Sequence, residues 1–207
     1  MEIDLKKENS KNIFFIMAAS LVFSAFFQLG SSSMSNLMNL LIVGSGSVMF
    51  SAVSLMITNI LPQSVKHKLV FTRLKNELPA CRIDKLCQKD SRVEYSSIKD
   101  RWPEIFVDDI TPETRNSRWY QKIYKPVKDT KEVLQAHRTF LLYRDTFSGL
   151  LLIFLVTGVW SFTADSKIFG EINPIVFLIQ GSLVFFSFLA ARVSGNRFVV
   201  NAVAAAE

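Results

Sequence analysis

The stretch LMNLLIVGSGSVMFSAVSLMITNIL, residues 37–61, decides the fold because it contains no Asp, Glu, Lys, Arg or His. A helix rises 1.5 Å per residue, so this run reaches about 37 Å, enough to cross a hydrocarbon core of roughly 30 Å. A core helix of a water-soluble protein keeps a polar face, and this run has no charged position from which to build one. The stretch therefore predicts a transmembrane helix.

Three further runs also lack ionisable residues: 13–29, 146–164 and 174–191. Each is long enough to span a bilayer with some tilt or local thinning. The first run is longer than the apolar core of a typical signal peptide, and no convincing cleavage site follows it, so we expect it to remain as a span. The sequence predicts an all-α membrane protein whose four transmembrane helices form two hairpins.

The charged residues are concentrated between the two pairs of apolar runs. Residues 62–145 contain 18 of the 24 Lys and Arg and 12 of the 18 Asp and Glu, a net charge of +6, and the rest of the chain is neutral. The first 12 residues carry three lysines and the last 16 carry two arginines, whereas the links within the two pairs contain one lysine. Because basic segments stay in the cytosol, we expect a bacterial inner-membrane protein with both termini and the central segment cytosolic.

These boundaries divide the chain into five parts. They are a cytosolic amino-terminal segment (1–12), a first transmembrane hairpin (13–61), a mostly helical cytosolic insert (62–145), a second hairpin (146–191) and a cytosolic tail (192–207).

Breakers and caps predict the helices of the insert. The second span should continue as a helix over 65–78 until Pro79 breaks it. Thr111 before a proline is a typical helix start, and Pro126 should end that helix. A further helix from Lys131 meets no breaker before Gly149, so we expect it to run into the third span.

The insert contains a basic and aromatic stretch, NSRWYQKIYKPVKD, at residues 116–129. Four basic residues are spaced three, four and three apart and share one face of the predicted helix: Arg115, Arg118, Lys122 and Lys125. Trp119 and Tyr124 lie on the rest of its surface. One interpretation is a solvated basic face over a packed aromatic side. The alternatives are that these six residues contact anionic lipid or a cytosolic protein, or a nucleotide or nucleic acid, for which no motif is present.

Small and uncharged polar residues are the remaining features of the spans. Small residues let helices approach closely in lipid, so we expect the protein to self-associate through the second span, with four candidates for this packing: Gly44, Gly46, Ser47 and Ser51. Polar side chains in the spans hydrogen-bond between helices or line a pore of the oligomer. Three of them are candidates for the pore lining: Asn39, Thr157 and Gln180.

The sequence contains no constellation typical of catalysis or metal binding. The stretch GSGSV at residues 44–48 departs from a hydrolase elbow, because Gly46 occupies the nucleophile position and no histidine lies in a span. Cys81 and Cys87 are spaced too widely for a typical zinc pair. Ion-coupled carriers use charged residues within the membrane, and these runs have none. We therefore expect a non-enzymatic protein without a cofactor or metal.

The layout of four spans around a cytosolic insert resembles the small four-span membrane components of bacterial anti-phage defence systems. The resemblance covers the topology of the whole chain, and no site residue follows from it. It implies an oligomeric sensor or adaptor that couples a cytosolic partner or signal to the membrane. Two alternatives stay open: a pore-forming effector, and a passive scaffold that recruits a soluble protein.

Overall fold

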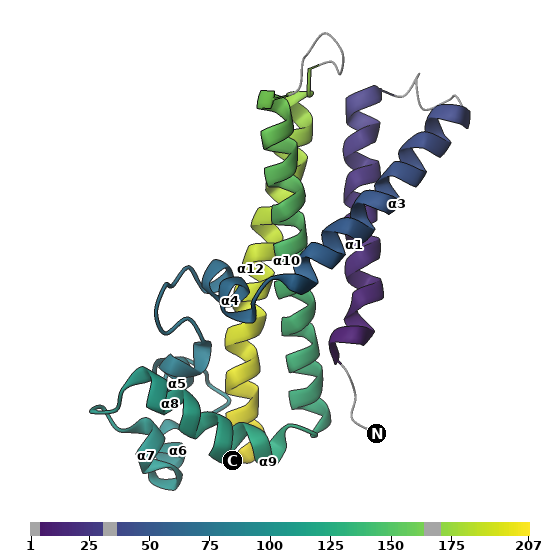
Figure 1. Cartoon of the computed structure of the whole chain (residues 1–207). Helices are drawn as coiled ribbons and strands as arrows, with labels where there is room; N and C mark the ends of the chain where they lie inside the picture. The colour runs from purple at the N-terminus through teal and green to yellow at the C-terminus, as the bar shows by residue number, and fades with distance from the viewer. Residues whose placement is uncertain (1–4, 31–36, 164–170) are drawn as a thin grey trace. The chain divides into compact units, whose positions relative to one another are not determined.

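The computed structural model describes residues 5–30, 37–163 and 171–207, and every regular element among them is helical. Four helices are long and apolar enough to cross a membrane: α1 (Leu5–Leu29), α3 (Leu37–Ile60), α10 (Lys131–Thr163) and α12 (Pro174–Ala206) (Figure 1). The predicted fold class, an all-α protein with four candidate transmembrane helices, is confirmed. The two-hairpin arrangement stays a prediction, because the links at 31–36 and 164–170 lie outside the described residues.

Contacts divide the chain into two compact units. The first, which we call the membrane unit, comprises Met1–Pro62 and Arg144–Leu189. The second, the basic unit, comprises Gln63–Tyr143 and Ala190–Glu207. The basic unit therefore contains the predicted insert and the predicted tail together, although the sequence analysis treats them as separate parts. Helices α10 and α12 each contribute residues to both units, and α10 begins at Lys131 as predicted.

The membrane unit exposes large apolar side chains and buries small hydroxyl groups. On α3, Met49, Met56 and Ile60 are exposed, Ile60 by 81 %. Among the side chains of this helix that the structure describes, the buried ones are small and polar: Ser47, Ser51, Ser54 and Thr58. Their spacing of four, three and four places them on one face, and α3 packs on α1. This distribution is typical of helices that face lipid, where small residues form the helix contacts.

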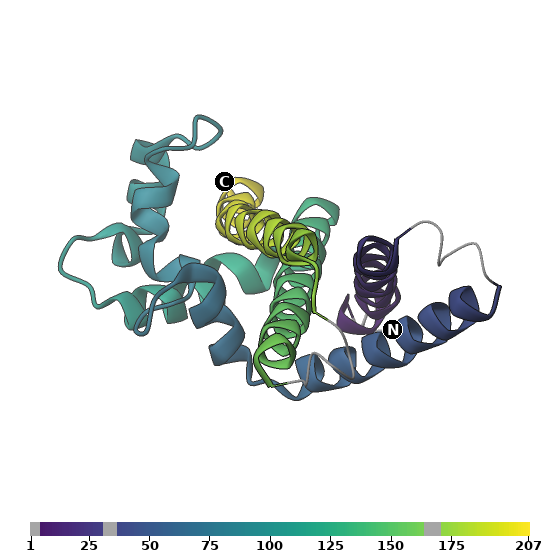
Figure 2. The ribbon, with the colours of Figure 1, turned by 90° about the horizontal axis from the view of Figure 1, so that it is seen from above.

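Two of the buried serines donate hydrogen bonds within their own helices, whereas the buried hydroxyl of Thr58 has no hydrogen-bond partner among the described residues. Ser51 donates to the carbonyl oxygen of Ser47 at 2.6 Å, and Ser24 on α1 donates to that of Ser20 at 2.8 Å. Each serine therefore needs no partner across the interface. Seen from above, α1 is viewed almost along its axis whereas α3 extends sideways from it (Figure 2). The two helices are thus inclined to each other.

The chain does not continue as one helix after α3, as the sequence analysis expects for residues 65–78. Helix α4 covers Gln63–Phe71 and ends at Thr72, whose φ of 52° is left-handed. A left-handed residue other than glycine is uncommon and marks a turn. The helical prediction is therefore wrong for residues 72–78, and the chain turns seven residues before Pro79.

Four short helices follow and build one side of the basic unit. They are η1 (Pro79–Arg82), α5 (Ile83–Cys87), α6 (Tyr95–Arg101) and α7 (Pro103–Phe106). Their apolar residues Ile83, Ile98, Ile105 and Phe106 are at most 1 % exposed. The basic unit thus has the core of a protein that folds in water, with apolar side chains inside.

The stretch of residues 112–127 is helical throughout, as α8 (Pro112–Trp119), η2 (Tyr120–Tyr124) and α9 (Lys125–Val127). Thr111 caps it, because its hydroxyl accepts from the backbone N–H of Thr114 at 3.3 Å, which confirms the predicted start. Pro126 does not end the helix. The preceding turn is a π-helix, in which the N–H of Lys125 donates to the carbonyl of Tyr120. The wider turn accommodates a proline that has no N–H of its own.

An aromatic cluster from distant parts of the chain forms the centre of the basic unit. Phe198 on α12 stacks on His137 with 4.6 Å between ring centroids, and its ring edge meets Trp119 at 5.9 Å and Tyr124 at 5.4 Å. The Tyr124 hydroxyl and Nδ1 of His137 lie 3.0 Å apart. The cluster joins α8, η2, α10 and the tail into one core.

Candidate functional site

A cleft of about 380 Å³ lies in the membrane unit, and all four long helices line it. Its walls are mainly apolar, with Leu21 and Ala25 from α1, Ile42 and Val43 from α3 and Val176 from α12 among them. Its volume falls in the range of small-molecule sites, roughly 300–1,000 Å³. The cleft combines apolar walls with polar groups.

The polar groups of the cleft come from each of the four helices. They are Ser24 and Gln28 on α1, Ser47 on α3, Thr157 on α10 and Gln180 on α12. Thr157 donates back to the carbonyl of Ile153 at 2.9 Å, so its proton is committed to its own helix. None of the described residues that line the cleft is ionisable. The cleft therefore suits a neutral occupant, because a charge would be costly there.

Gln180 is one of three buried polar residues that line the cleft, together with Ser24 and Ser47. Its side chain is 5 % exposed, and Nε2 donates to Ser24 Oγ over 3.4 Å. The Ser24 hydroxyl gives its single proton to the Ser20 carbonyl, so a flipped amide would place its oxygen against an oxygen that has no proton to offer. The observed orientation is therefore the better one. Among the residues that the structure describes, none donates a hydrogen bond to Gln180 Oε1.

Gln28 forms hydrogen bonds between the end of α1 and the residues just before α12. Its Nε2 donates to the carbonyl of Glu171 at 2.9 Å, and its Oε1 accepts from the backbone N–H of Asn173 at 2.8 Å. The Asn173 side chain returns a hydrogen bond to the carbonyl of Phe27 at 3.2 Å. These contacts join the end of α1 to the start of α12. Both polar atoms of the Gln28 amide thus have a hydrogen-bond partner, whereas Gln180 Oε1 has none among the described residues.

The structure brings together residues that the sequence analysis assigns to two different roles. Gly46 and Ser47, expected at a helix contact, and Thr157 and Gln180, expected to line a pore, all lie around this cleft. Gly44 and Ser51 do not line it. Asn39 belongs to α3, but its side chain lies outside the described residues.

The glycines that allow close approach are not the ones expected from the sequence. A Cβ added at Gly44 or Gly46 would meet nothing within 4 Å. At Gly149 it would lie 2.7 Å from Met17 Sδ, and at Gly195 it would lie 2.6 Å from Phe71 Cζ. Gly44 and Gly46 therefore have no packing role among the described residues, and their part in self-association stays a prediction.

The predicted basic stripe does not exist as a set of four exposed charges. Arg115 is only 7 % exposed, and its NH1 lies 3.2 Å from Asp84 Oδ1. Its Nε and NH2 donate to the carbonyls of Ile105 and Val107 at 3.1 and 2.8 Å. Arg115 is therefore bound within the fold and adds little accessible charge to the stripe, and its role as a contact residue for lipid or a partner stays a prediction.

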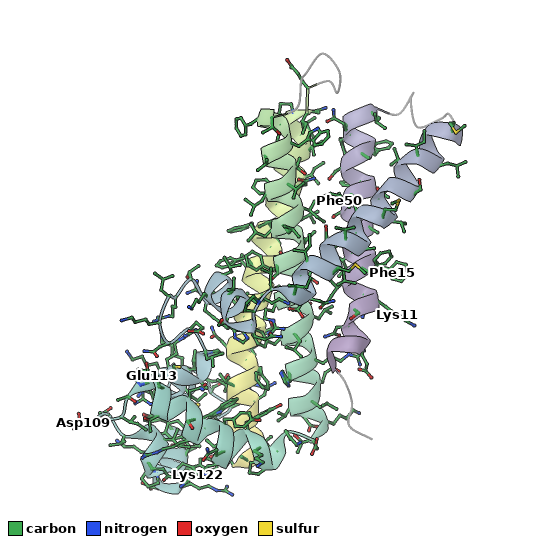
Figure 3. All side chains as sticks on the ribbon, viewed as in Figure 1. Lys11, Phe15, Phe50, Asp109, Glu113 and Lys122 are labelled. Carbon is green, nitrogen blue, oxygen red and sulfur yellow. The ribbon has the colours of Figure 1, made fainter. Side chains whose placement is uncertain are left out.

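The other three members of the stripe are more accessible. Arg118 donates to the carbonyl of Glu104 at 2.7 Å, and Lys122 forms an ion pair with the Glu104 carboxylate at the surface (Figure 3). The hydrogen bond from Lys122 is the main cause that lowers the pKa of Glu104. Lys125 is exposed, as is Tyr120 beside it on η2. The accessible part of the stripe therefore consists of Lys122 and Lys125. The exposed ring of Tyr120, at the start of η2, lies close to them in the sequence.

Trp119 and Tyr124 belong to the core of the basic unit. Their rings stack at 5.5 Å, and burial is the main cause that raises the pKa of Tyr124. Trp119 is buried and Tyr124 is half-buried. The interpretation of the aromatic side as packed core fits these positions better than stacking on a ligand.

The two cysteines are buried thiols rather than reactive groups. Burial raises the pKa of Cys87 to about 12, with smaller contributions from Asp90, Asp84 and Glu207. Burial also raises the pKa of Cys81, followed by the effect of Glu113. The thiolate is the nucleophilic form, so neither cysteine is activated near neutral pH. No group of three or more metal-ligating side chains occurs among the described residues.

Ser24 and Gln28 lie four residues apart on one face of α1, and their small or polar side chains within an apolar run mark them in the sequence. Sequence reasoning missed Phe198 as an organising residue, because the tail lies far along the chain from the residues that Phe198 contacts. Trp160, which sits near one end of α10 and lines the cleft, is the aromatic residue of the span that suits a membrane interface.

No known protein family matches the chain, and no curated protein or solved structure is significantly similar to it.

Proposed function

We propose that this protein is a non-enzymatic membrane adaptor or sensor whose basic unit binds a cytosolic protein at the bacterial inner membrane, of the kind that acts in anti-phage defence. The observation that carries the proposal is the construction of the chain from two different units. One has helices that can cross a bilayer, and the other is a separately packed, basic unit with a water-type core. A tethered folded unit of this kind suits recruitment of a soluble partner.

The contacts within the basic unit support the expected topology. Arg82 and Arg92 of the insert bind the side-chain oxygens of Asn196 and Asn201 in the tail, at 3.4 and 2.9 Å. Segments that pack together in this way lie on one side of a membrane. The chain between them must then cross the membrane an even number of times, which fits one crossing each by α10 and α12. The positive charge of these segments favours the cytosol as that side.

Labelling of single cysteines in intact cells tests this topology. Ser97 and Ala205 are exposed positions of the basic unit, whereas residues 32 and 166 lie in the predicted outer links. A membrane-impermeant maleimide should modify cysteines at 32 and 166 and leave those at 97 and 205 unmodified until the membrane is opened. Modification at 97 or 205 in intact cells would refute the cytosolic assignment.

Lys122 and Lys125 are the accessible charges through which the basic unit would bind an acidic partner. We expect a partner purified with the protein in gentle detergent to be lost when both are changed to Glu, and to weaken as salt rises, because exposed charges are screened over about 8 Å at physiological ionic strength. The matched control is Lys85→Glu with Lys89→Glu, two exposed lysines elsewhere in the same unit. Equal loss in both double variants would show a charge effect without a defined surface.

The polar cleft favours one alternative, a pore-forming effector. Polar groups from all four long helices converge there, as they would beside a water-filled path in an oligomer. Ion flux through liposomes that contain the purified protein tests this alternative. Ion conduction that changes when Thr157 or Gln180 is replaced would support the pore. A passive scaffold, the second alternative, would bind its partner and show neither conduction nor a response of the membrane unit.

A further inference from the structure

We infer that the exposed face of helix α4 and the turn after it form a docking surface for anionic lipid headgroups. We call it the α4 surface, and it consists of three apolar residues and three cations: Val65, Leu69, Leu74, Lys68, Arg73 and Lys75. It is separate from Lys122 and Lys125, so the inference does not depend on the soluble partner proposed for those two lysines.

The first step of the argument is the distribution of residues around α4 (Figure 1). Successive residues of a helix are about 100° apart, so Val65, Lys68 and Leu69 lie within one arc. All three are exposed, whereas Val70 and Phe71 on the other side are fully buried in the core of the basic unit. A surface helix of a water-soluble unit carries polar residues on its outer face. The outer face of α4 instead presents two apolar side chains beside a lysine.

The second step is the charge of this segment. Residues 61–76 contain four Lys or Arg and no Asp or Glu. Lys66 is buried, but Lys68, Arg73 and Lys75 are exposed, and none of these three forms an ion pair within the part of the chain that the structure describes. Leu74, between the last two, is 85 % exposed. Apolar side chains among exposed cations suit the boundary between acyl chains and anionic headgroups.

The turn after α4 brings two further arginines to the same place. Arg192 donates to the hydroxyl of Thr72 at 3.4 Å, and the guanidinium of Arg82 lies 5.2 Å from the centre of the Phe71 ring. Burial lowers the pKa of Arg82, and the charges of Arg73 and Arg192 lower it further, while no carboxylate of the described residues contributes. Three like charges are thus held close together, an arrangement that favours an anion beside them.

The third step is the covalent link to α3. That helix has 24 residues and is about 36 Å long, so when it crosses a bilayer its ends reach the headgroup layers. It ends at Ile60 and α4 begins at Gln63, and three residues span at most about 11 Å. The α4 surface therefore stays within reach of headgroups however the two units are arranged. An acidic protein would have to compete with phosphates that are already there.

Fluorescence quenching at position 64 tests the inference in the full-length protein. Ser64 is an exposed residue of α4 outside the α4 surface, so Ser64→Cys can carry a bimane label, and the native Cys81 and Cys87 are buried. The labelled protein would be reconstituted in phosphatidylcholine nanodiscs that contain increasing fractions of phosphatidylglycerol or phosphatidylcholine with a nitroxide on the acyl chain. The two quenching lipids differ only in the headgroup, so the phosphatidylcholine measures contact without charge.

We expect half-maximal quenching at about a fivefold lower mole fraction of phosphatidylglycerol than of phosphatidylcholine, the factor that one basic residue near an anionic surface contributes. The preference should fall as salt rises, because exposed charges are screened. One variant reverses the cations of the α4 surface and should abolish the preference: Lys68→Glu, Arg73→Glu and Lys75→Glu. The matched control reverses three exposed lysines elsewhere in the basic unit and should retain it: Lys85→Glu, Lys89→Glu and Lys99→Glu.

A second variant separates the apolar contacts from the charges. Leu69→Gln with Leu74→Gln should weaken quenching by both lipids and leave the preference for phosphatidylglycerol. Equal quenching by the two lipids in the labelled protein without further changes, or the same preference in both charge-reversed variants, would overturn the inference. Loss of a soluble partner from the variant of the α4 surface, without any lipid preference in the unreversed protein, would assign the surface to a protein and overturn it as well.

Discussion

Helix α3 in the membrane unit and the aromatic cluster in the basic unit follow opposite rules within one chain. On α3 the buried face consists of Ser47, Ser51, Ser54 and Thr58, and the exposed face carries methionine and isoleucine. In the basic unit the buried groups are rings such as Phe198 and Trp119, and the lysines of η2 and α9 are at the surface. Large apolar side chains are thus exposed on α3 and buried in the basic unit.

The difference shows that the solvent, and not the residue type, decides what is buried. In water, burial of apolar area drives packing, so large rings fill the core. In lipid the surroundings are as apolar as the side chains, and close contact between small residues becomes the main source of helix association. The two units should therefore respond differently to the same kind of substitution.

The largest effect is expected from Phe198→Ala. The ring of Phe198 contacts His137, Trp119, Tyr124 and Phe140, and its loss should lower the free energy of unfolding of the basic unit by about 3–5 kcal/mol. Alkylation of the buried Cys87 during denaturant titration measures this opening. The control is Phe186→Ala on the same helix, where the ring is 66 % exposed and the change should stay within about 0.5 kcal/mol.

Arg115→Gln should destabilise the basic unit by about 3 kcal/mol, because it leaves the carboxylate of Asp84 and two carbonyls without their partner. Lys125→Gln changes a solvated charge ten residues further on and should stay within about 0.5 kcal/mol. Thermal unfolding in detergent compares the two. If both variants melt alike, Arg115 is not the internal residue that its contacts indicate.

Gly195→Ala should cost about 1–3 kcal/mol, because the new methyl group meets the rings of Phe71 and Phe140 at 2.6 and 2.8 Å. Gly44→Ala, in open space on α3, should be neutral or slightly stabilising, since alanine favours a helix by up to about 1 kcal/mol over glycine. Denaturant titrations of the two variants give the comparison. A loss of stability at Gly44 would indicate that another copy of the protein covers that face.

The smallest effect is expected from Ser51→Ala. Its hydroxyl binds the carbonyl of Ser47 in its own helix, so removal should change the stability of the membrane unit by at most about 0.6 kcal/mol. Ser51→Leu also removes the hydroxyl, but it adds bulk to the buried face. This variant should separate α3 from its neighbours. Thermal unfolding in detergent measures the stability of both variants. A larger effect of the alanine than of the leucine would show that polarity, not size, holds α3 in place.

The sequence was sufficient for the features that depend on local composition. The absence of charge over 37–61 predicted α3, and the Thr111–Pro112 pair and the uninterrupted run after Lys131 predicted the starts of α8 and α10. These features follow from the thickness of a bilayer, from helix capping and from the absence of helix-breaking residues. None of them requires knowledge of which segments meet.

What the sequence could not decide depends mainly on contacts between distant segments. Arg115 has the spacing of a surface stripe, and only the fold reveals that Asp84 and two carbonyls surround it. Pro126 was expected to end a helix, but the π-helical turn before it accommodates the proline and the helix continues. Gly44 and Gly46 have the same small size as Gly149 and Gly195, and only the neighbours distinguish them. The cleft around Gln180 likewise required all four helices to be placed.

The shared core of insert and tail imposes an order on the synthesis of the protein. Residues 63–143 leave the ribosome before α12 is made, so Trp119, Tyr124 and His137 must wait for Phe198 before their cluster can close. During that interval the nascent basic unit exposes aromatic surface, which makes it a client for chaperones and a target for proteases. Completion of the basic unit is thereby conditional on translation past the last span, and a chain that stalls before residue 198 is left open to degradation.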